Sequence, residues 1–298
     1  MRRDAAPRPS ASDIADTNMA VYDQPAVVAQ YEQSNGWINV GERSAVMHVA
    51  SLVRGKRILD VGVGGGRTAC LLSLLSDDYV GIDFTPGLMH ACQRRYPALD
   101  IRWGDARSLE FGDGSFDFVF FSFNGIDTLD HEGRRAALSE MHRVLSPGGI
   151  LAYSTLNRDG QSFGETPWQL HRPGRRANVT VRATLRLAWV TLRDPFRFFR
   201  RTKNWIAGRR HVRTGPDWSL APLSAEDFCL VNHFVTLPGL RREMAEAAFD
   251  IVAVYESEAE RDGVLPADAL TSDADGFQMV ARRRDEGTAT ESTPTTPE

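Results

Sequence analysis

The feature that most constrains this chain is a glycine-rich turn between an apolar segment and a helix-like segment. Residues 57–61 are mostly apolar and contain Asp60, glycines follow at positions 62, 64 and 66, and a helical run starts at Ala69. This order predicts a strand, a tight turn and a helix. Glycine tolerates positive φ and leaves space where a side chain would collide, so the turn suits a ligand that touches main chain. A second apolar strand ends at Asp83, at the sheet edge where α/β proteins bind ligands.

The spacing of the glycines distinguishes between ligand classes. A dinucleotide-binding turn reads Gly-x-Gly-x-x-Gly, whereas this one reads Asp-x-Gly-x-Gly-x-Gly. A carboxylate here would repel a pyrophosphate and suits an amine or a sulfonium. The stretch resembles the first motif of class I S-adenosylmethionine-dependent methyltransferases. The resemblance implies that the glycine turn holds the methionyl part of the cofactor and that Asp83 accepts from both ribose hydroxyls. The cofactor-binding residues expected at these two strand ends are Asp60, Gly62, Gly64, Gly66, Asp83 and Phe84.

Three later segments resemble the same family in the same order. Residues 99–106 read as a short strand ending at Asp105, and in the family this acid meets the adenine amino group while the next amide, here that of Ala106, meets a ring nitrogen. Residues 114–124 have an unbroken apolar centre, which is typical of a strand buried on both faces. By resemblance its end brings Phe123 and Asn124 to the methyl-transfer centre. Residues 142–151 carry the family's Arg-Val-Leu-x-Pro-Gly-Gly signature.

The resemblance, together with the composition, predicts the organisation of the chain. We expect an α/β, doubly wound Rossmann-like sheet of seven strands, mostly parallel, with an antiparallel C-terminal hairpin. A methyltransferase domain over 18–284 would carry a helical insert, or lid, at about 158–233, and 1–17 and 285–298 would be disordered tails because they lack periodic apolar residues. Three widely spaced cysteines and the lack of a secretory apolar core favour a cytoplasmic protein, and no Cys/His cluster has metal-binding spacing.

The residues before the first strand predict a cover for the cofactor. Apolar and aromatic residues between 20 and 50 suggest two helices. Tyr22 and Tyr31 are candidates to place a ring against the sulfonium, a contact worth about 0.5–2 kcal/mol. Packing within a helix explains the same two residues equally well.

The segment 171–213 is strongly basic, with thirteen Arg or Lys and a single acid, Asp194. Arginines and apolar residues recur there at helical spacing, and Pro195 is expected to divide the segment into two helices. Three interpretations remain open: a lid with solvated arginines, a site for an anionic substrate, and a contact with an anionic membrane, which is not favoured. Nucleic acid is the weakest candidate partner because the rest of the chain is acidic.

The function that this pattern favours is methyl transfer to a small-molecule acceptor by in-line displacement. Asp127 and His131 follow the fourth strand and are weak candidates for a base, although a capping or surface role suits each of them better. The alternatives are a lipid-like or membrane-associated acceptor, an NAD-dependent oxidoreductase of the same fold, and a non-catalytic cofactor-binding protein. The glycine spacing disfavours the oxidoreductase, and the three aspartates at strand ends disfavour the non-catalytic protein.

Overall fold

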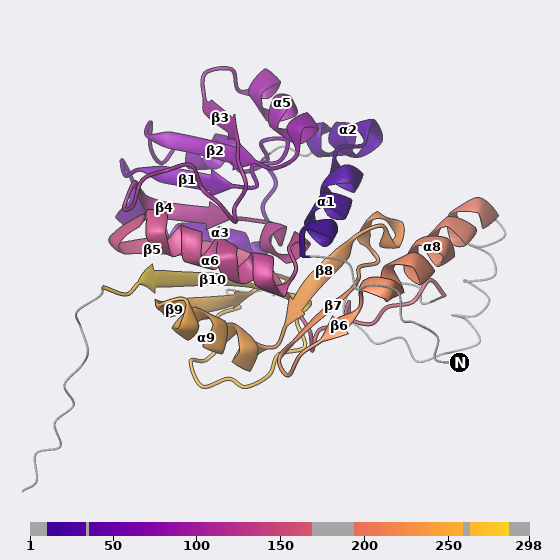
Figure 1. Ribbon diagram of the computed structural model, residues 1–298. Coiled ribbons are helices and arrows are strands. Elements are labelled where there is room, and N and C mark those ends of the chain that lie inside the picture. The colour runs from indigo at the N-terminus through magenta and orange to yellow at the C-terminus, as the bar shows by residue number, and fades with distance from the viewer. Residues whose placement is uncertain (1–10, 34–35, 169–193, 259–262, 286–298) are drawn as a thin grey trace, which may run out of the picture.

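The computed structural model describes residues 11–33, 36–168, 194–258 and 263–285. Within these residues ten strands form one sheet in the order β3-β2-β1-β4-β5-β8-β7-β6, and β10 joins β5 to β9 (Figure 1). Strands β1 to β5 are parallel to their neighbours, and β10 is antiparallel to both β5 and β9. The strands are β1 (Ile58–Val61), β2 (Tyr79–Asp83), β3 (Asp100–Trp103), β4 (Phe116–Phe121), β5 (Leu145–Asn157), β6 (Arg213–Thr214), β7 (Trp218–Pro222), β8 (Val231–Val235), β9 (Phe249–Glu256) and β10 (Gly276–Arg283).

Helices cover both faces of the parallel strands. On one face α3 packs with α4 and α5 against Phe118 and Phe120, and on the other α6 and α9 pack against Val119 and Phe121. The strand β4 is therefore buried on both sides, as its unbroken apolar centre predicts. The α-helices are α1 (Ala11–Tyr22), α2 (Pro25–Gln33), α3 (Val40–Val53), α4 (Ala69–Leu72), α5 (Pro86–Arg95), α6 (His131–Val144), α8 (Pro195–Gly208) and α9 (Leu237–Glu246). Short 3-10 turns are η1 (Gly125–Thr128), η2 (Arg209–His211) and η3 (Ala225–Phe228).

Local sequence explains where α6 begins and which face it buries. The Asp130 side chain accepts a hydrogen bond from the Gly133 amide at 2.9 Å and caps the first turn. Ala137, Leu138, Met141 and Val144 then recur at helical spacing and are all fully buried. The helix therefore follows directly from the end of β4 and keeps its first turn at the ligand-binding edge of the sheet.

The predicted seven-stranded sheet is present, but the strand count is wrong because the insert adds three more. Strand β8 pairs with β5 only at Leu156 and Asn157, while β10 pairs with β5 along residues 150–156. Strands β7 and β6 then continue outward from β8. The insert is therefore not the purely helical lid that was expected: it contains α8 and a small antiparallel extension of the sheet. Pro195 is the first residue of α8, as expected for a helix start, and residues 169–193 lie outside the described residues.

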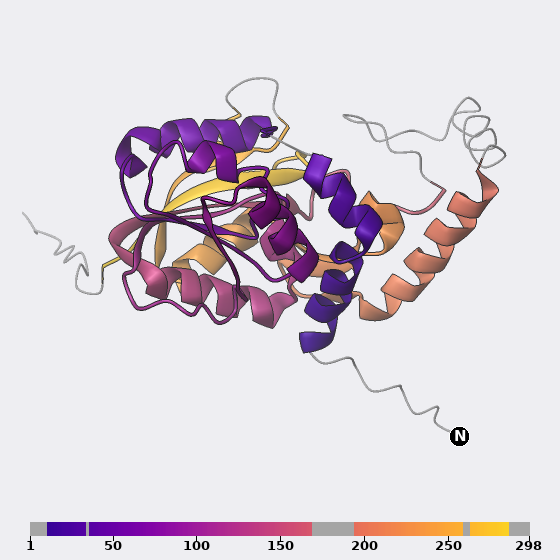
Figure 2. The ribbon, with the colours of Figure 1, turned by 90° about the horizontal axis from the view of Figure 1, so that it is seen from above.

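The expected disordered tail at 1–17 is wrong in its boundary, because α1 begins at Ala11. Ile14 packs against Leu220 and Val231 of the insert. The Asn18 amide group donates to the carbonyls of Val231 at 2.8 Å and Thr128 at 2.9 Å. These contacts hold α1 between the parallel strands and the insert, with α2 beside α5 (Figures 1 and 2). Residues 1–10 and 286–298, the rest of the two expected tails, lie outside the described residues.

None of the helices described here has both the length and the apolar character of a membrane span. In the described residues no three His, Cys, Asp or Glu side chains are arranged to hold a metal ion.

Candidate functional site

The glycine turn after β1 adopts the backbone that its sequence predicts. Gly62, Gly64 and Gly66 have φ values of 66°, 57° and 87°, a region that L side chains rarely adopt. A Cβ on Gly62 would lie 2.7 Å from the Phe121 ring, and one on Gly66 would lie 2.7 Å from the Tyr96 ring. The turn is therefore wedged between the end of β4 and α5, and only glycine fits at these two points.

Asp83 ties the turn to the end of the neighbouring strand. Its carboxylate accepts from the Gly64 amide at 2.8 Å and from the Thr85 amide at 2.8 Å. The side chain is buried, and burial raises its pKa although the two backbone hydrogen bonds oppose that shift. A carboxylate that is fixed by two amides, with lone pairs to spare, is suited to accept from a ligand hydroxyl as well.

These elements enclose one side of a cavity of about 800 Å³, counted with the solvent at its mouth, which we call the donor cavity. Seven of the ten predicted cofactor residues line it, namely Gly62, Gly64, Asp83, Phe84, Asp105, Ala106 and Phe123. Its described lining includes two carboxylates, those of Asp83 and Asp105, and no Lys or Arg. A cavity with this charge suits a cation, and it offers nothing to neutralise a pyrophosphate.

The other three predicted cofactor residues do not line the donor cavity. Asp60 lies behind the turn, where one oxygen accepts from the hydroxyls of Tyr79 at 2.9 Å and Thr68 at 3.0 Å. Its Oδ1 is buried without a hydrogen-bond partner among the described residues, and burial raises the pKa of this carboxyl to about 7. Gly66 faces α5, and Asn124 lines the neighbouring cavity described below.

The N-terminal helices α1 and α2 form a further wall of the donor cavity, and α2 lies directly against the turn. Tyr22 and Tyr31, the two tyrosines predicted as a cover, both line it, and their rings meet edge to face at 5.8 Å. Ala15 and Met19 of α1 complete this wall. Gly65 lets α2 come close, because a Cβ there would lie 2.7 Å from the Tyr31 carbonyl oxygen. The cover therefore depends on a glycine outside the recognised motif.

Asp105, predicted from the sequence to contact a ligand amino group, pairs with an arginine of the chain itself. Arg107 approaches both carboxylate oxygens, with its Nε at 3.0 Å from each and its Nη2 at 2.7 Å from Oδ2. The same guanidinium lies 5.4 Å from the centre of the Phe84 ring. The carboxylate at the cavity wall is thus held by an arginine, and a ligand amino group would have to share it.

A buried ion pair fixes Phe123, which lines the donor cavity two residues after the end of β4. Glu42 makes two hydrogen bonds with Arg67, at 2.7 and 2.8 Å, and accepts from the Phe123 amide at 3.1 Å. The Arg67 guanidinium lies 4.9 Å from the centre of the Phe123 ring and 5.4 Å from that of Trp37. Phe123 itself has a φ of 51°, a strained backbone for an aromatic residue. Glu42 therefore holds the Phe123 main chain, and Arg67 packs against the Phe123 ring.

Phe123 also lines a second, wider cavity, which we call the acceptor cavity. Its other walls come from the α3 entry (Trp37), the end of β5 (Leu156), the insert and the β9–β10 connection. Arg201 of α8 is its one described arginine or lysine, Glu258 and Asp275 are among its other lining residues, and the Nε of Arg201 is buried without a hydrogen-bond partner among the described residues. The two cavities therefore meet at a single ring, and the second has mixed charge.

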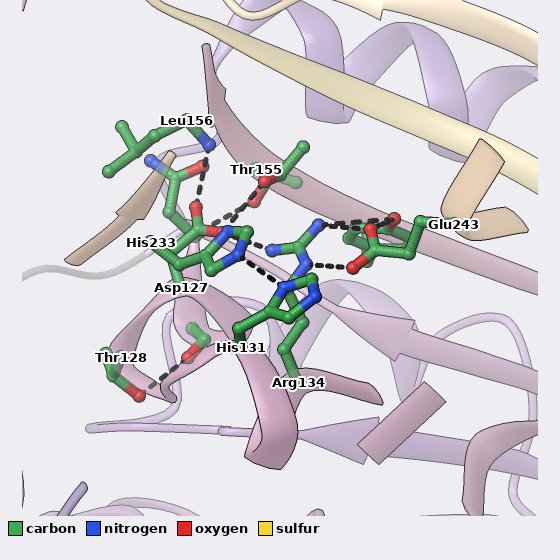
Figure 3. A network of polar contacts seen from close by, with 12 residues as sticks. Asp127, Thr128, His131, Arg134, Thr155, Leu156, His233 and Glu243 are labelled. Carbon is green, nitrogen blue, oxygen red and sulfur yellow. Dashed lines mark hydrogen bonds and ion pairs between the residues drawn. The ribbon is translucent and has the colours of Figure 1, made fainter. Parts of the chain in front are cut away.

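Asp127, one of the two candidate bases, is part of a buried structural network (Figure 3). It forms an ion pair with Arg134 and accepts from the Thr155 hydroxyl at 2.8 Å and the Leu156 amide at 2.7 Å. Arg134 also binds Glu243 of α9, and although burial acts against it, the charges of these carboxylates raise the pKa of Arg134. Asp127 lines neither cavity, so the structure does not place it as a base.

His131, the second candidate base, faces the insert instead. Its Nδ1 lies 3.2 Å from the Nε2 of His233, and its ring stacks on Trp218 with the ring centres 4.2 Å apart. Burial lowers the pKa of both histidines, that of His233 strongly. Figure 3 shows the two imidazoles side by side next to Arg134. His131 lines a separate cavity beside α9 and has no access to the donor cavity there.

Comparisons with known proteins agree with this geometry. A family model described as a methyltransferase domain matches residues 58–149. The chain is 34% identical over 148 residues to a demethylmenaquinone methyltransferase of Renibacterium salmoninarum. It is 35% identical over 166 residues to a phthiotriol/phenolphthiotriol dimycocerosates methyltransferase of Mycobacterium leprae. Residues 58–149 of this chain therefore carry a methyltransferase domain.

These matches cover only part of the chain and only part of each relative. The two alignments cover 48% and 53% of the chain but only 60% and 58% of the two relatives. Over its length the chain also resembles a Burkholderia thailandensis 1,6-didemethyltoxoflavin-N1-methyltransferase, solved with bound 1,6-didemethyltoxoflavin and S-adenosylhomocysteine. That likeness has a TM-score of 0.57 at 13% identity, covers 94% of this chain and 93% of the other, and concerns the fold alone.

Several residues around the two cavities were not predicted from the sequence. Arg107 lies two positions after Asp105, a spacing that by itself suggests a pair, and Gly65 stands within a run of three glycines. By contrast, nothing local marks Glu42 as the partner of Arg67, because the pair joins segments 25 residues apart. Ala15 and Met19 carry no pattern that separates a cavity wall from a helix face.

Proposed function

We propose that this chain transfers a methyl group from S-adenosylmethionine to a small-molecule acceptor. The observation that carries the proposal is the described lining of the donor cavity, which combines the Asp83 carboxylate, the Asp105 carboxylate paired with Arg107, aromatic rings and bare glycine backbone, with no Arg or Lys among the lining residues themselves. A sulfonium and an amine are matched by such a lining, and an anionic dinucleotide is not. The bound cofactor supplies the methyl group together with its own leaving group.

The chain's own residues would bind and orient the donor. Gly62 and Gly64 leave room for the ligand against main chain, and Asp83 accepts from the ribose hydroxyls. Tyr22 and Tyr31 cover the cavity and exclude water from it. Alignment and exclusion of water are the main tasks of the protein in an in-line displacement. No base is assigned, because neither Asp127 nor His131 lines the donor or the acceptor cavity.

We infer further that the acceptor enters from the other side of Phe123. This ring lines both cavities and is held by Glu42 and Arg67, so it marks the place where donor and acceptor meet. The acceptor cavity has apolar walls at Trp37 and Leu156. A lipid-like acceptor is the second candidate: the two relatives named above are methyltransferases for demethylmenaquinone and for phthiotriol dimycocerosates, and α8 of the insert exposes Phe196 and Phe199.

Titration calorimetry with S-adenosylmethionine, S-adenosylhomocysteine and NAD tests the donor assignment. We expect binding of the first two and none of NAD. Asp83→Ala should weaken S-adenosylmethionine binding by about 1.5–3 kcal/mol, the scale of a hydrogen bond to a charged group. The matched control is Asp77→Ala, an exposed aspartate on the turn before β2, which should bind like the wild type. Unchanged affinity of Asp83→Ala rejects the ribose placement, and tight NAD binding rejects the proposed function.

Cell extract incubated with cofactor labelled at the methyl group tests the acceptor. Label that partitions into organic solvent identifies a lipid-like acceptor, and label in the aqueous phase identifies a polar one. Donor binding without any labelled product points to a non-catalytic cofactor-binding protein.

A further inference from the structure

Helix α8 exposes large apolar side chains that the proposed reaction does not use. Phe196 is 84% exposed, Phe199 is 70% exposed and Ile206 is 61% exposed. At 100° per residue these three positions fall within about 80° of one another, and we call them the α8 stripe. The exposed Lys203 projects from the same arc, so the stripe carries one cation among its apolar side chains. Soluble proteins rarely group bulky apolar side chains in the open without a partner. The stripe is therefore a candidate contact surface.

The opposite side of α8 is firmly seated, which fixes the direction in which the stripe points. Asn204 donates to the Asp227 carbonyl at 3.0 Å, and the Arg201 guanidinium lies 5.0 Å from the Phe228 ring. A Cβ on Gly208 would lie 2.8 Å from Pro222, so the helix end sits directly on β7. Figures 1 and 2 both show α8 at the outer margin of the molecule. The stripe faces outward because the inner face is occupied.

The charge around the stripe is predominantly positive, although Asp194 caps the first turn of α8. Residues 195–210 contain six Arg or Lys and no Asp or Glu. Asp227 of η3 pairs with Arg197 and Arg200, and at 3.7 Å with Arg201. Two carboxylates are too few to neutralise six cations, and Lys203, Arg209 and Arg210 are exposed. A partner for this surface must therefore combine an apolar interior with negative charge at its boundary.

We propose that α8 docks this chain on the surface of an anionic lipid bilayer. With 14 residues the helix is about 21 Å long, too short to cross a hydrocarbon core of about 30 Å but suited to lie in the interface. The stripe would enter the acyl boundary while Lys203, Arg209 and Arg210 meet the headgroups, as in interfacial amphipathic helices. Charge complementarity to a surface of anionic lipids selects this occupant over a neutral apolar one.

The position of α8 gives the docking a consequence at the acceptor cavity. Arg201, on the seated side of the helix, lines that cavity. A membrane held by the stripe would lie on the far side of the same helix, within one helix diameter, about 10–12 Å, of the cavity wall. This consequence rests on the proposed function, whereas the docking itself does not.

Co-sedimentation of the full chain with vesicles tests the proposal without any assay of methyl transfer. We expect binding to phosphatidylcholine vesicles containing about 30% phosphatidylglycerol, and at least about fivefold weaker binding to pure phosphatidylcholine, the effect of about one surface cation. Raising NaCl from about 0.1 M to about 1 M should weaken it, because the screening length falls from about 10 Å to about 3 Å. Salt-insensitive binding that is equal on both vesicles overturns the proposal.

Matched variants assign the binding to the stripe. Phe196→Ser together with Phe199→Ser should weaken vesicle binding at least about tenfold, since two rings no longer enter the interface. Lys203→Glu should weaken it at least about fivefold on the anionic vesicles. The control is Leu74→Ser, a leucine that is 77% exposed elsewhere on the surface, which should leave binding unchanged. Thermal melts confirm that these exposed sites leave the fold intact.

Three results would overturn the assignment. Equal losses for Leu74→Ser and the double variant show non-specific adsorption. A dimer in light scattering that Phe199→Ser dissociates shows that a second copy covers the stripe. Single-stranded poly(U) that binds as tightly as the vesicles, with the same sensitivity to Lys203→Glu, shows a nucleic-acid surface instead.

Discussion

Gly65 offers a sharp test of how the donor cavity is covered. It lies between two glycines of the recognised motif but has no positive φ of its own, so an alanine there adds a methyl group without straining the backbone. That methyl would lie 2.7 Å from the Tyr31 carbonyl oxygen, 2.9 Å from its carbon and 3.1 Å from the Glu32 nitrogen. All three atoms are main chain of α2, and side-chain rotation cannot relieve the contact. The helix must retreat by about 0.7 Å to reach an ordinary van der Waals distance of 3.4 Å.

The expected cost has two parts. Overpacking of this kind destabilises by about 1–3 kcal/mol, which corresponds to a Tm lower by about 2–10 °C for a chain of this size. Retreat of α2 also withdraws the Tyr31 ring from the donor cavity. Losing one aromatic contact with a cation, worth about 0.5–2 kcal/mol, should weaken S-adenosylmethionine binding by about 2- to 30-fold.

Calorimetric titration and a thermal melt of Gly65→Ala measure both parts. Gly112→Ala is the matched control, because it has no positive φ and its added methyl would lie 3.5 Å from the Ser115 hydroxyl, an ordinary contact. If Gly65→Ala keeps the wild-type Tm and affinity, α2 does not rest on the turn and the described cover is refuted.

Three further substitutions test the buried charges. Glu42→Gln should destabilise the fold by about 3–5 kcal/mol in chemical denaturation, because Arg67 is left as a buried cation without its carboxylate; a loss under about 1 kcal/mol contradicts a desolvated pair. Asp127→Asn should likewise destabilise by about 3 kcal/mol, since Arg134 loses a carboxylate partner, yet keep the methyl-transfer rate per folded molecule, whereas loss of a general base would lower that rate about 10²–10⁴-fold. Burial raises the pKa of Asp60 from 3.8 to about 7, so the wild type should lose stability relative to Asp60→Asn as pH rises between these values. Parallel stability curves for the two proteins over that range would show that Asp60 ionises as freely in the fold as in the unfolded chain.

The parts of the fold that the sequence predicted are those decided by neighbouring residues. The positive φ values of the turn require glycine at positions 62, 64 and 66. The unbroken apolar run of β4 predicts a strand that is buried on both faces, and the structure buries it so. The predicted boundary of the N-terminal tail was wrong because Ile14, inside the predicted tail, packs against Leu220 and Val231, which lie far along the chain. The strands of the insert were not predicted for a similar reason. Strand β8 joins the sheet through only two residues of β5, Leu156 and Asn157, which lie far from it in the sequence.

The same distinction applies to the site. The predicted residues at the strand ends gather around one cavity because parallel strands end at one edge. Asp60 faces away because Tyr79 and Thr68 bind it from behind, which no spacing rule reveals. Asp127 has a position along the chain that suits a base, but its partners Arg134, Thr155 and Leu156 come from other elements.

Helix α1 belongs to both halves of the molecule, and this matters for anyone building chimaeras. Ile14 is fixed by the insert while its neighbour Ala15 forms part of the donor wall. An insert transplanted from another protein of this fold would lack the residues that contact Ile14 and Asn18. Helix α1, and with it this wall of the donor cavity, would then be held less firmly. Grafts that exchange α1 together with residues 158–235 should therefore succeed where the insert on its own fails.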